Sequence, residues 1–171
     1  VELDVTGALT QVPELIGEKV ADLVLLNDGV MTYAKIRFDE DSLVTLKNHL
    51  GKIGDSLARA LCSSAAWDML RDAEISVTDF VDIALAGLPG ETDITVVSPI
   101  TARLATAVDE YAHTSMSDAL RTRVASGLEA LMESAEPTSD HHLQVASSFA
   151  TLATTATQTQ RISDVLSAAI K

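Results

Sequence analysis

The hydrophobic period of this chain changes at Asp39, and the change constrains the fold more than any other feature. Before it, two apolar runs, Val20–Leu26 and Val30–Phe38, flank the dipeptide Asp28-Gly29. Asp-Gly readily supplies the positive φ that a tight turn needs, so this pattern predicts a β-hairpin. After Asp39, apolar residues recur at helical spacing almost to the last residue. The sequence therefore predicts the end of a β domain joined to a helical domain.

The residues ahead of the helices are too few to form a stable sheet by themselves. Val1–Val5 also alternates between apolar and polar residues, but three short strands are marginal in isolation. We therefore expect residues 1–38 to be the end of a β-sandwich and its linker, and residues 39–171 to be a truncated C-terminal helical domain. The chain begins with Val1 and not with Met, which favours a piece of a larger protein.

Seven helices are predicted from capping signals and apolar spacing. Pro99 lies inside one of them, where it either kinks the helix or marks its first position after a Ser98 cap. The starting signals are Asp39, Asp55, Ser76-x-x-Asp79, Ser115-x-x-Asp118, Ser139 and Thr157-x-x-Gln160. The predicted helices cover about 39–53, 55–72, 76–87, 92–112, 115–136, 139–155 and 157–169.

Short links between helices make sequence neighbours pair as antiparallel hairpins. A pair recurs about every 35 to 40 residues, close to the spacing of armadillo and HEAT repeats. Ala, Leu and Val dominate the 47% apolar fraction, and only 4% of residues are aromatic, which suits closely packed helices. The predicted fold is mainly α: an irregular right-handed α–α superhelix of HEAT- or armadillo-like helix pairs, preceded by a short β-hairpin from a truncated β-sandwich.

The charge balance disfavours two classes of partner. With 25 acidic and 12 basic residues the net charge is −13, and such a surface repels nucleic-acid phosphates and anionic lipid. No uncharged apolar run approaches the roughly 20 residues that span a bilayer. The single cysteine, Cys62, cannot form an internal disulfide, which points to a reducing compartment. We therefore expect a cytoplasmic protein with neither nucleic-acid nor membrane partners.

The segment Leu25–Arg37, LLNDGVMTYAKIR, resembles the linker into the C-terminal helical domain of actinobacterial aminopeptidase N, in the zinc-dependent gluzincin aminopeptidase family. Further similarities follow in order, from about Val20 to Phe149, and such a run is far more specific than one short motif. They are Asp55–Leu61, Ala66–Met69, Arg71–Glu74, Gly87–Pro89 with Glu91–Asp93, and Pro137 with Ser139–Asp140.

The resemblance implies a parent enzyme that removes N-terminal residues from peptides, with zinc in a catalytic domain that carries His-Glu-x-x-His and a distant Glu. Neither this motif nor the family's Gly-x-Met-Glu-Asn motif occurs here, and His49, His113, His141 and His142 have the wrong spacing. We expect no catalytic residue, metal ligand or cofactor in this chain. The implied role is to cover the active-site cavity and restrict access, with the catalytic domain and peptide substrates as partners.

The residues most open to a binding role are Trp67, Asp68 and Arg71. A tryptophan at this spacing is more often a core anchor between helices. The i,i+3 spacing of Asp68 with Arg71, and of Arg71 with Glu74, favours ion pairs on the surface. The alternative is that all three side chains line a peptide cavity, with Arg71 pairing a peptide carboxylate through its fork of donors.

Two further questions stay open at this level. Tyr33, Lys35 and Arg37 alternate along the second predicted strand and share one face. The two basic residues either dock against the parent's catalytic domain or block the addition of another strand. For the whole chain, the alternative function is a free-standing α-solenoid that binds peptides or proteins without catalysis.

Overall fold

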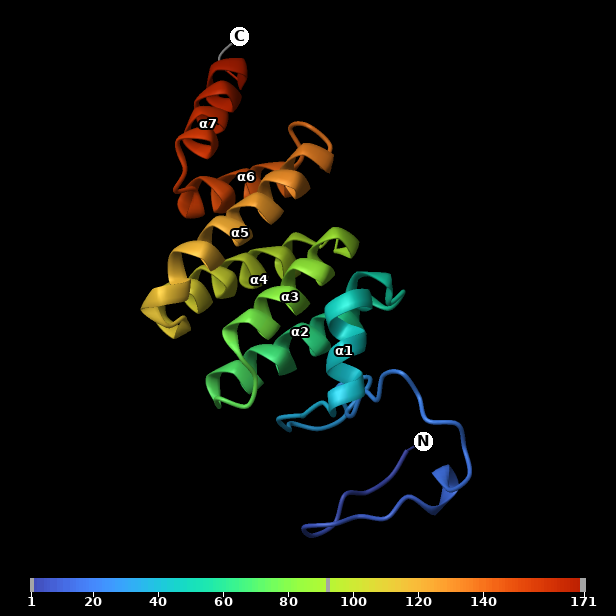
Figure 1. Cartoon of the computed structure of the whole chain (residues 1–171). Helices are drawn as coiled ribbons and strands as arrows, with labels where there is room; N and C mark the ends of the chain where they lie inside the picture. Colours follow the sequence, from blue (N-terminus) through green and yellow to red (C-terminus); the bar gives the residue numbers. More distant parts are fainter. Residues whose placement is uncertain (1, 92, 170–171) are drawn as a thin grey trace.

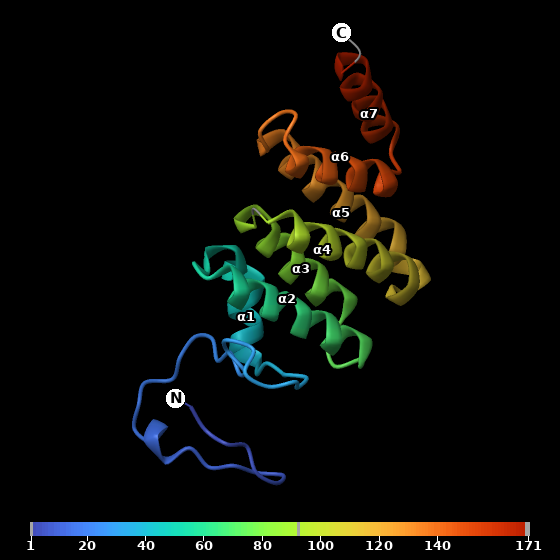
Figure 2. The same cartoon turned by 180° about the vertical axis from the view of Figure 1, so that it is seen from behind.

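The computed structural model describes residues 2–91 and 93–169 and is mainly helical. The helices stack from α1 at one end to α7 at the other, and residues 2–38 extend irregularly from the α1 end (Figures 1 and 2). The helices are α1 Glu40–His49, α2 Ser56–Arg71, α3 Val77–Gly87, α4 Ile94–Thr106, α5 Thr114–Ser134, α6 Asp140–Leu152 and α7 Ala156–Ala169. Short 3₁₀ turns are η1 Pro13–Leu15, η2 Leu50–Lys52 and η3 Leu88–Gly90, and η4 Ala107–Tyr111 is a π-helical turn.

The helices form two layers. In one layer α1, α3 and α5 contact one another in succession, and in the other α2, α4 and α6 do the same. The layers are joined where sequence neighbours pack together, most extensively α2 on α3 and α5 on α6. The mainly helical prediction is therefore confirmed, while the right-handed superhelical twist stays a prediction.

Four of the predicted helix starts are confirmed by their caps. Asp39 accepts a hydrogen bond from the third amide of α1 at 2.7 Å, and Asp55 accepts from two amides of α2 at 2.7 and 3.2 Å. Ser76 and Asp79 form a reciprocal capping box at the start of α3, and Ser139 accepts from an amide of α6 at 3.1 Å. Each contact satisfies an amide that the helix itself leaves without a partner.

The start of α5 differs from the prediction. Its N-cap is His113, whose Nδ1 accepts a hydrogen bond from the amide of Ser115 at 3.3 Å. The expected capping box of Ser115 and Asp118 is therefore wrong, because both residues already lie inside the helix. Histidine is not among the preferred N-cap residues, so propensity alone favoured the nearby serine.

The capping signal of the last helix lies two residues earlier than predicted, at Thr155 and not at Thr157. The amide of Gln158 donates to Thr155 Oγ1 at 3.2 Å, and the amide of Thr155 donates to Gln158 Oε1 at 3.3 Å. The sequence repeats the same signal in Thr157-x-x-Gln160, so the pattern fits both registers. The observed register buries Gln158, which is 4% exposed, against α5.

The helix predicted at 92–112 is shorter and ends in a wide turn. Its expected first residue lies outside the described residues, and the observed N-cap of α4 is Asp93, which accepts from the second helical amide at 2.9 Å. Pro99 lies inside α4, so the alternative start after Ser98 is wrong. After Thr106 the chain continues as the π-helical turn η4, where Ala112 donates to Ala107 over five residues at 3.1 Å.

The predicted hairpin is not confirmed, because none of residues 2–91 or 93–169 is in a strand. The expected turn does form: Asn27, Gly29 and Val30 have positive φ values of 59°, 78° and 57°. The Asn27 side chain then forms hydrogen bonds with the carbonyl and the amide of Thr32, at 2.7 and 3.0 Å. These are the backbone groups with which the hydrogen bonds between two paired strands would begin. A two-stranded ribbon is marginal by itself, so the apolar runs on either side find other partners.

Those partners are the helices. Leu25 packs against the helical core, and Ile36 and Phe38 are buried at 9% and 7% exposure. The amide of Val24 donates to the hydroxyl of Ser42 in α1 at 3.0 Å. Residues 23–38 are therefore bound at both ends to the helical body.

One continuous apolar core runs through the helical body. Its largest fully buried side chains come from helices α1, α3, α4, α5 and α6 and from the turns η2 and η3. They are Phe80, Phe149, Leu46, Leu50, Ile83, Leu88, Leu104, Leu128 and Leu152. Because these side chains belong to one cluster of buried residues, the helices form one packed unit.

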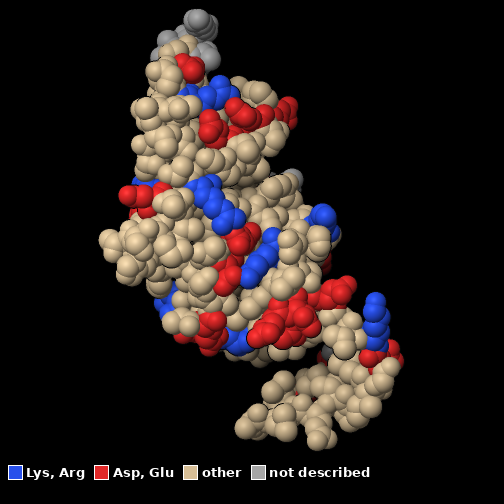
Figure 3. Space-filling view, in the orientation of Figure 1, with Lys and Arg blue, Asp and Glu red and all other residues tan. Residues whose placement is uncertain are grey.

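Ion pairs join successive helices of the layer that contains α1, α3 and α5. Lys47 of α1 pairs with Asp79 of α3, and Arg123 of α5 pairs with Asp82 of α3. Arg161 of α7 continues the series by binding a carboxylate of α5 at 2.7 Å. Basic and acidic side chains accordingly lie next to one another over the helical stack in Figure 3. These ion pairs link neighbouring helices of the stack.

Candidate functional site

An aromatic and charged group lies where α2 and α4 end. We call it the Trp67 cluster: Trp67, Asp68, Arg71, Arg103 and Tyr111. The first three lie on the last turns of α2, Arg103 lies on α4, and Tyr111 closes η4. The structure thus adds two residues from a later part of the chain to the three that the sequence singled out.

The Trp67 ring is the centre of the cluster. It is partly buried, and its centroid lies 5.3 Å from the ring of Phe80, which is a core residue of α3. The ring of Tyr111 also approaches it edge-on, with a centroid distance of 5.7 Å and an interplanar angle of 68°. Tilted and edge-on pairs of this kind are the favoured arrangements of aromatic rings. Trp67 is therefore anchored in the core and still presents part of its ring at the surface.

Arg103 completes the cluster from α4. Its guanidinium carbon lies 5.9 Å from the centroid of the Trp67 ring, within cation–π range. Burial lowers the pKa of the Arg103 guanidinium, the Asp68 carboxylate raises this pKa, and Arg71 lowers it. An arginine keeps its charge even so. Asp68, Arg71 and Arg103 are therefore close enough to influence one another electrostatically.

The expected ion pairs of Arg71 are absent from the described part of the chain. Arg71 pairs neither with Asp68 nor with Glu74, although the sequence spacing favours both. The second pair fails because α2 ends at Arg71 and Ala73 turns the chain with a φ of 59°. Glu74 consequently lies beyond the helix and is not on its face.

Arg71 and Arg103 differ from the other arginines of the chain. The chain has seven arginines, all of them in the described residues. Those in ion pairs are Arg37, Arg59, Arg121, Arg123 and Arg161. The two that form no ion pair with any described residue are the two in the Trp67 cluster. In so acidic a protein, two neighbouring guanidinium groups that form no ion pair suit an anionic ligand.

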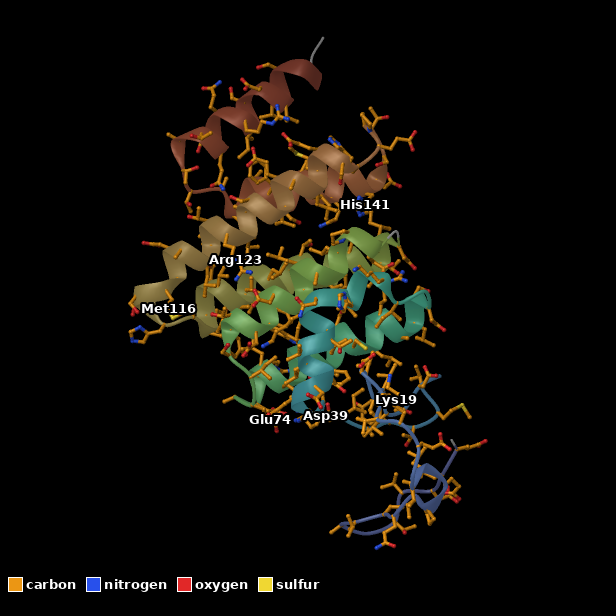
Figure 4. All side chains as sticks on the ribbon, turned by 45° about the vertical axis from the view of Figure 1, so that its right-hand side comes forward. Lys19, Asp39, Glu74, Met116, Arg123 and His141 are labelled. Atoms are coloured by element: carbon orange, nitrogen blue, oxygen red, sulfur yellow. The ribbon has the colours of Figure 1, made fainter. Side chains whose placement is uncertain are left out.

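Lys35 and Arg37 bind acids of this same chain. The Lys35 ammonium lies 2.8 Å from an oxygen of Asp72, and Arg37 pairs with both Asp72 and Glu74. Figure 4 shows Glu74 at the end of the stack where the N-terminal segment joins it. We expected Lys35 and Arg37 either to dock against another domain or to block the addition of a strand. In the structure both form ion pairs with acids of this same chain. Tyr33, on the same predicted face, is fully exposed.

Arg103 carried a signal in the sequence that the spacing arguments missed. It is the only charged residue between Asp93 and Asp109, in a stretch that is otherwise apolar or hydroxyl-bearing. A lone arginine there is costly to bury without a partner, so it merits attention. Tyr111 had no such signal, because its position beside Trp67 depends on the extra residue of the π-helical turn. Such turns are frequent at functional sites.

The described residues do not fit a nucleophilic or metal centre. Cys62 is fully buried, and burial, with a smaller contribution from Asp28, raises the pKa of its thiol to about 11. The reactive thiolate is therefore scarce near neutral pH. No three His, Cys, Asp or Glu side chains of the described chain are placed to hold a metal ion together, and His141 and His142 occupy successive positions of α6.

A shallow hollow on the surface lies apart from the cluster. It measures about 230 Å³ and lies between α4 and α6, lined mainly by serine, threonine and alanine. Its hydroxyls bind their own helices: Thr101 donates to Ser98, Ser148 to Gln144 and Thr151 to Ser147, each to the carbonyl at 3.0 Å. These short side chains serve the close approach of two helices.

Comparison with known proteins identifies the family. Residues 23–171 match the ERAP1-like C-terminal domain. Aminopeptidase N of Streptomyces lividans is 44% identical over 158 residues, which is 92% of this chain and 18% of that relative's length. None of the helices in the described residues is long and apolar enough to cross a membrane. The chain therefore belongs to the ERAP1-like C-terminal domain family, and its likeness to aminopeptidase N bears out the resemblance stated from the sequence.

Proposed function

We propose that this chain is the C-terminal helical domain of a zinc-dependent, cytoplasmic aminopeptidase that removes N-terminal residues from peptides. The observation that carries the proposal is the match to aminopeptidase N, which covers 92% of this chain and 18% of the relative. The described residues offer no set of zinc ligands, so the catalytic domain of the parent would hold the metal. That domain is then the main partner of this chain, within one polypeptide.

The role of this domain is to cover the active-site cavity and limit which peptides enter. A two-layered helical stack continued as a right-handed superhelix supplies a curved wall for this purpose. In the parent, residues 1–38 complete the β-sandwich that precedes the helical domain. Their attachment to α1 and α2 supports this role, because it fixes the helical wall relative to whatever precedes it.

The Trp67 cluster is the part of this wall that contacts the peptide. Arg71 is exposed and free of ion pairs with described residues, so its fork of donors is available to a peptide carboxylate. The rings of Trp67 and Tyr111 contact the apolar part of the peptide, and Asp68 keeps Arg103 in place electrostatically. None of these groups takes part in bond cleavage.

The test is peptide-length dependence in the full-length enzyme. With Arg71→Ala or Arg103→Ala, kcat/KM for an aminoacyl-nitroanilide should stay unchanged, because so short a substrate does not reach the cluster. For an octapeptide with a free carboxylate it should fall roughly tenfold or more, since a charge-assisted hydrogen bond contributes about 1.5–3 kcal/mol.

Two controls make this test specific. The same octapeptide with an amidated C-terminus should show no effect of either substitution, and Lys52→Ala removes an exposed positive charge at a distance from the cluster. If kcat/KM for the octapeptide with a free carboxylate is the same in the arginine variants as in the natural enzyme, the proposed contact is refuted. Loss of nitroanilide hydrolysis would show instead that the substitutions damage the catalytic domain.

A free-standing solenoid that binds peptides or proteins is the second candidate. It is supported by the continuous core, which gives the helices a packed interior of their own. The parent reading frame separates the two: a His-Glu-x-x-His upstream of Val1 supports the enzyme, and a native start codon at Val1 supports the solenoid. In either case the chain alone should not hydrolyse aminoacyl-nitroanilides, with or without added zinc.

A further inference from the structure

Four charged side chains attach the N-terminal segment to the end of α2. Lys35 donates to both oxygens of Asp72 at 2.8 and 3.2 Å, and Arg37 pairs with Asp72 and with Glu74. Arg37 also donates to the carbonyl of Ile36 at 3.0 Å, which fixes its direction. We call Lys35, Arg37, Asp72 and Glu74 the latch. The Lys35 ammonium beside Asp72 is the main cause that holds the pKa of this carboxyl below its ordinary value.

The turn after α2 holds both acids of the latch in position. The amide of Ala73 donates to the carbonyl of Leu70 at 3.0 Å, and that of Glu74 donates to Met69 at 2.9 Å. These two hydrogen bonds and the positive φ of Ala73 form a Schellman motif. The last turn of α2, which leads into this motif, carries Asp68 and Arg71. The latch and the Trp67 cluster therefore share one short structural element.

The charges of the latch are accessible to salt. Side-chain exposure is 57% for Lys35, 33% for Arg37, 34% for Asp72 and 43% for Glu74. Pairs at such exposure are weakened by screening, with a Debye length of about 10 Å at 0.1 M salt and about 3 Å at 1 M. Residues 31–35 are exposed, and Ile36 is the only buried residue of the segment 31–37. Apart from Ile36, the ion pairs are therefore the main contacts that hold this segment against α2.

We propose that the latch is a salt-sensitive clasp that holds residues 31–37 on the end of α2, and that its release alters the packing of the Trp67 cluster on the same helical turn. The latch belongs to this chain alone and does not depend on peptide cleavage. Its function is to couple the position of the N-terminal segment to the state of the cluster.

The chain itself provides both reporters for a test. Trypsin cleaves after lysine and arginine, so cleavage after Lys35 and Arg37 measures how often these side chains leave their partners. Trp67 is the only tryptophan, so its fluorescence emission reports on the cluster alone. Both are recorded from 0.05 to 1 M NaCl for the natural sequence, for Asp72→Asn/Glu74→Gln, and for a control with the same loss of charge.

The control is Asp22→Asn/Glu18→Gln, since both acids are exposed and form no ion pair with described residues. Salt should accelerate cleavage of the natural chain and of the control about tenfold, and shift Trp67 emission over the same range. The latch variant should be cleaved rapidly at low salt, with its emission already shifted. A latch variant as resistant as the control overturns the clasp. Faster cleavage without any change in Trp67 emission overturns the coupling.

Discussion

A buried ion pair offers the most direct test of how the helices are held together. Arg59 of α2 and Glu91, ahead of α4, are 8% and 3% exposed. Two parallel contacts join them, each at 3.3 Å. Arg59 also donates to the carbonyl of Ile53 at 2.7 Å, and Glu91 accepts from the amide of Asp93 at 3.2 Å. The pair thus connects three separate parts of the chain.

Removing one partner should destabilise the fold strongly. Arg59→Met leaves the Glu91 carboxylate buried without its main counter-charge and removes a donor from the carbonyl of Ile53. Losses of this kind cost about 3–5 kcal/mol, because the buried charge that remains has lost the arginine that offset its desolvation. In a domain of this size, such a loss lowers Tm by roughly 10 °C. The double variant Arg59→Met/Glu91→Leu removes both charges and should recover most of the lost stability.

Urea unfolding measures these differences, with Trp67 fluorescence and helical circular dichroism recorded on the same samples. The unfolding free energy should rank natural chain, double variant and Arg59→Met in descending order, and both signals should change together if unfolding is two-state. A loss below about 1 kcal/mol in Arg59→Met would refute the uncompensated-charge argument. A double variant no more stable than the single one would place the effect in lost packing of the arginine stem.

Three further outcomes can be measured with the same assay. Gly90→Ala should cost at least about 1–3 kcal/mol, because a Cβ there would lie 2.1 Å from a backbone carbonyl oxygen, whereas Gly54→Ala, which meets nothing within 4 Å, should be nearly neutral. Trp67→Ala should cost roughly 3 kcal/mol and Trp67→Phe less, by circular dichroism, since the ring fills a core-facing site. The backbone amide of Ser42 holds the pKa of Asp39 below its ordinary 3.8. The stability that this shift contributes is complete above pH 3.8 and is lost as the pH falls through the lower pKa of the folded state. Asp39→Asn should therefore reduce the slope of the unfolding free energy against pH in this range. An unchanged slope would contradict this.

The helices could be predicted because their starts are set by local chemistry. The caps at Asp39, Asp55 and Ser139 involve residues within three positions of one another, so spacing alone was sufficient. The register of α7 could not be chosen this way, since two overlapping signals were equally good. Burial of Gln158 against α5 decides it, and burial is a property of the whole fold.

The N-terminal segment shows the opposite case. Its alternation suggested paired strands, yet whether a strand forms depends on a partner, which periodicity does not reveal. In the structure the turn is present, but Ile36 and Phe38 go into the helical core and Arg37 goes to acids beyond α2. These are contacts across more than thirty residues. No local pattern predicts them.

The distribution of ion pairs over the two layers indicates on which side of this domain we expect a ligand to bind. In the layer of α1, α3 and α5, the basic side chains Lys47 and Arg123 are engaged with acids of neighbouring helices. On the α2 and α4 side, Arg59 pairs with Glu91, whereas Arg71 and Arg103 form no ion pair with a described residue, although Asp68 acts on the charge of Arg103. Two neighbouring guanidinium groups that are outside ion pairs and beside an aromatic ring are the groups on this side best suited to an anion. Binding should therefore concentrate on the α2 and α4 side, and the ion-paired layer serves as its support.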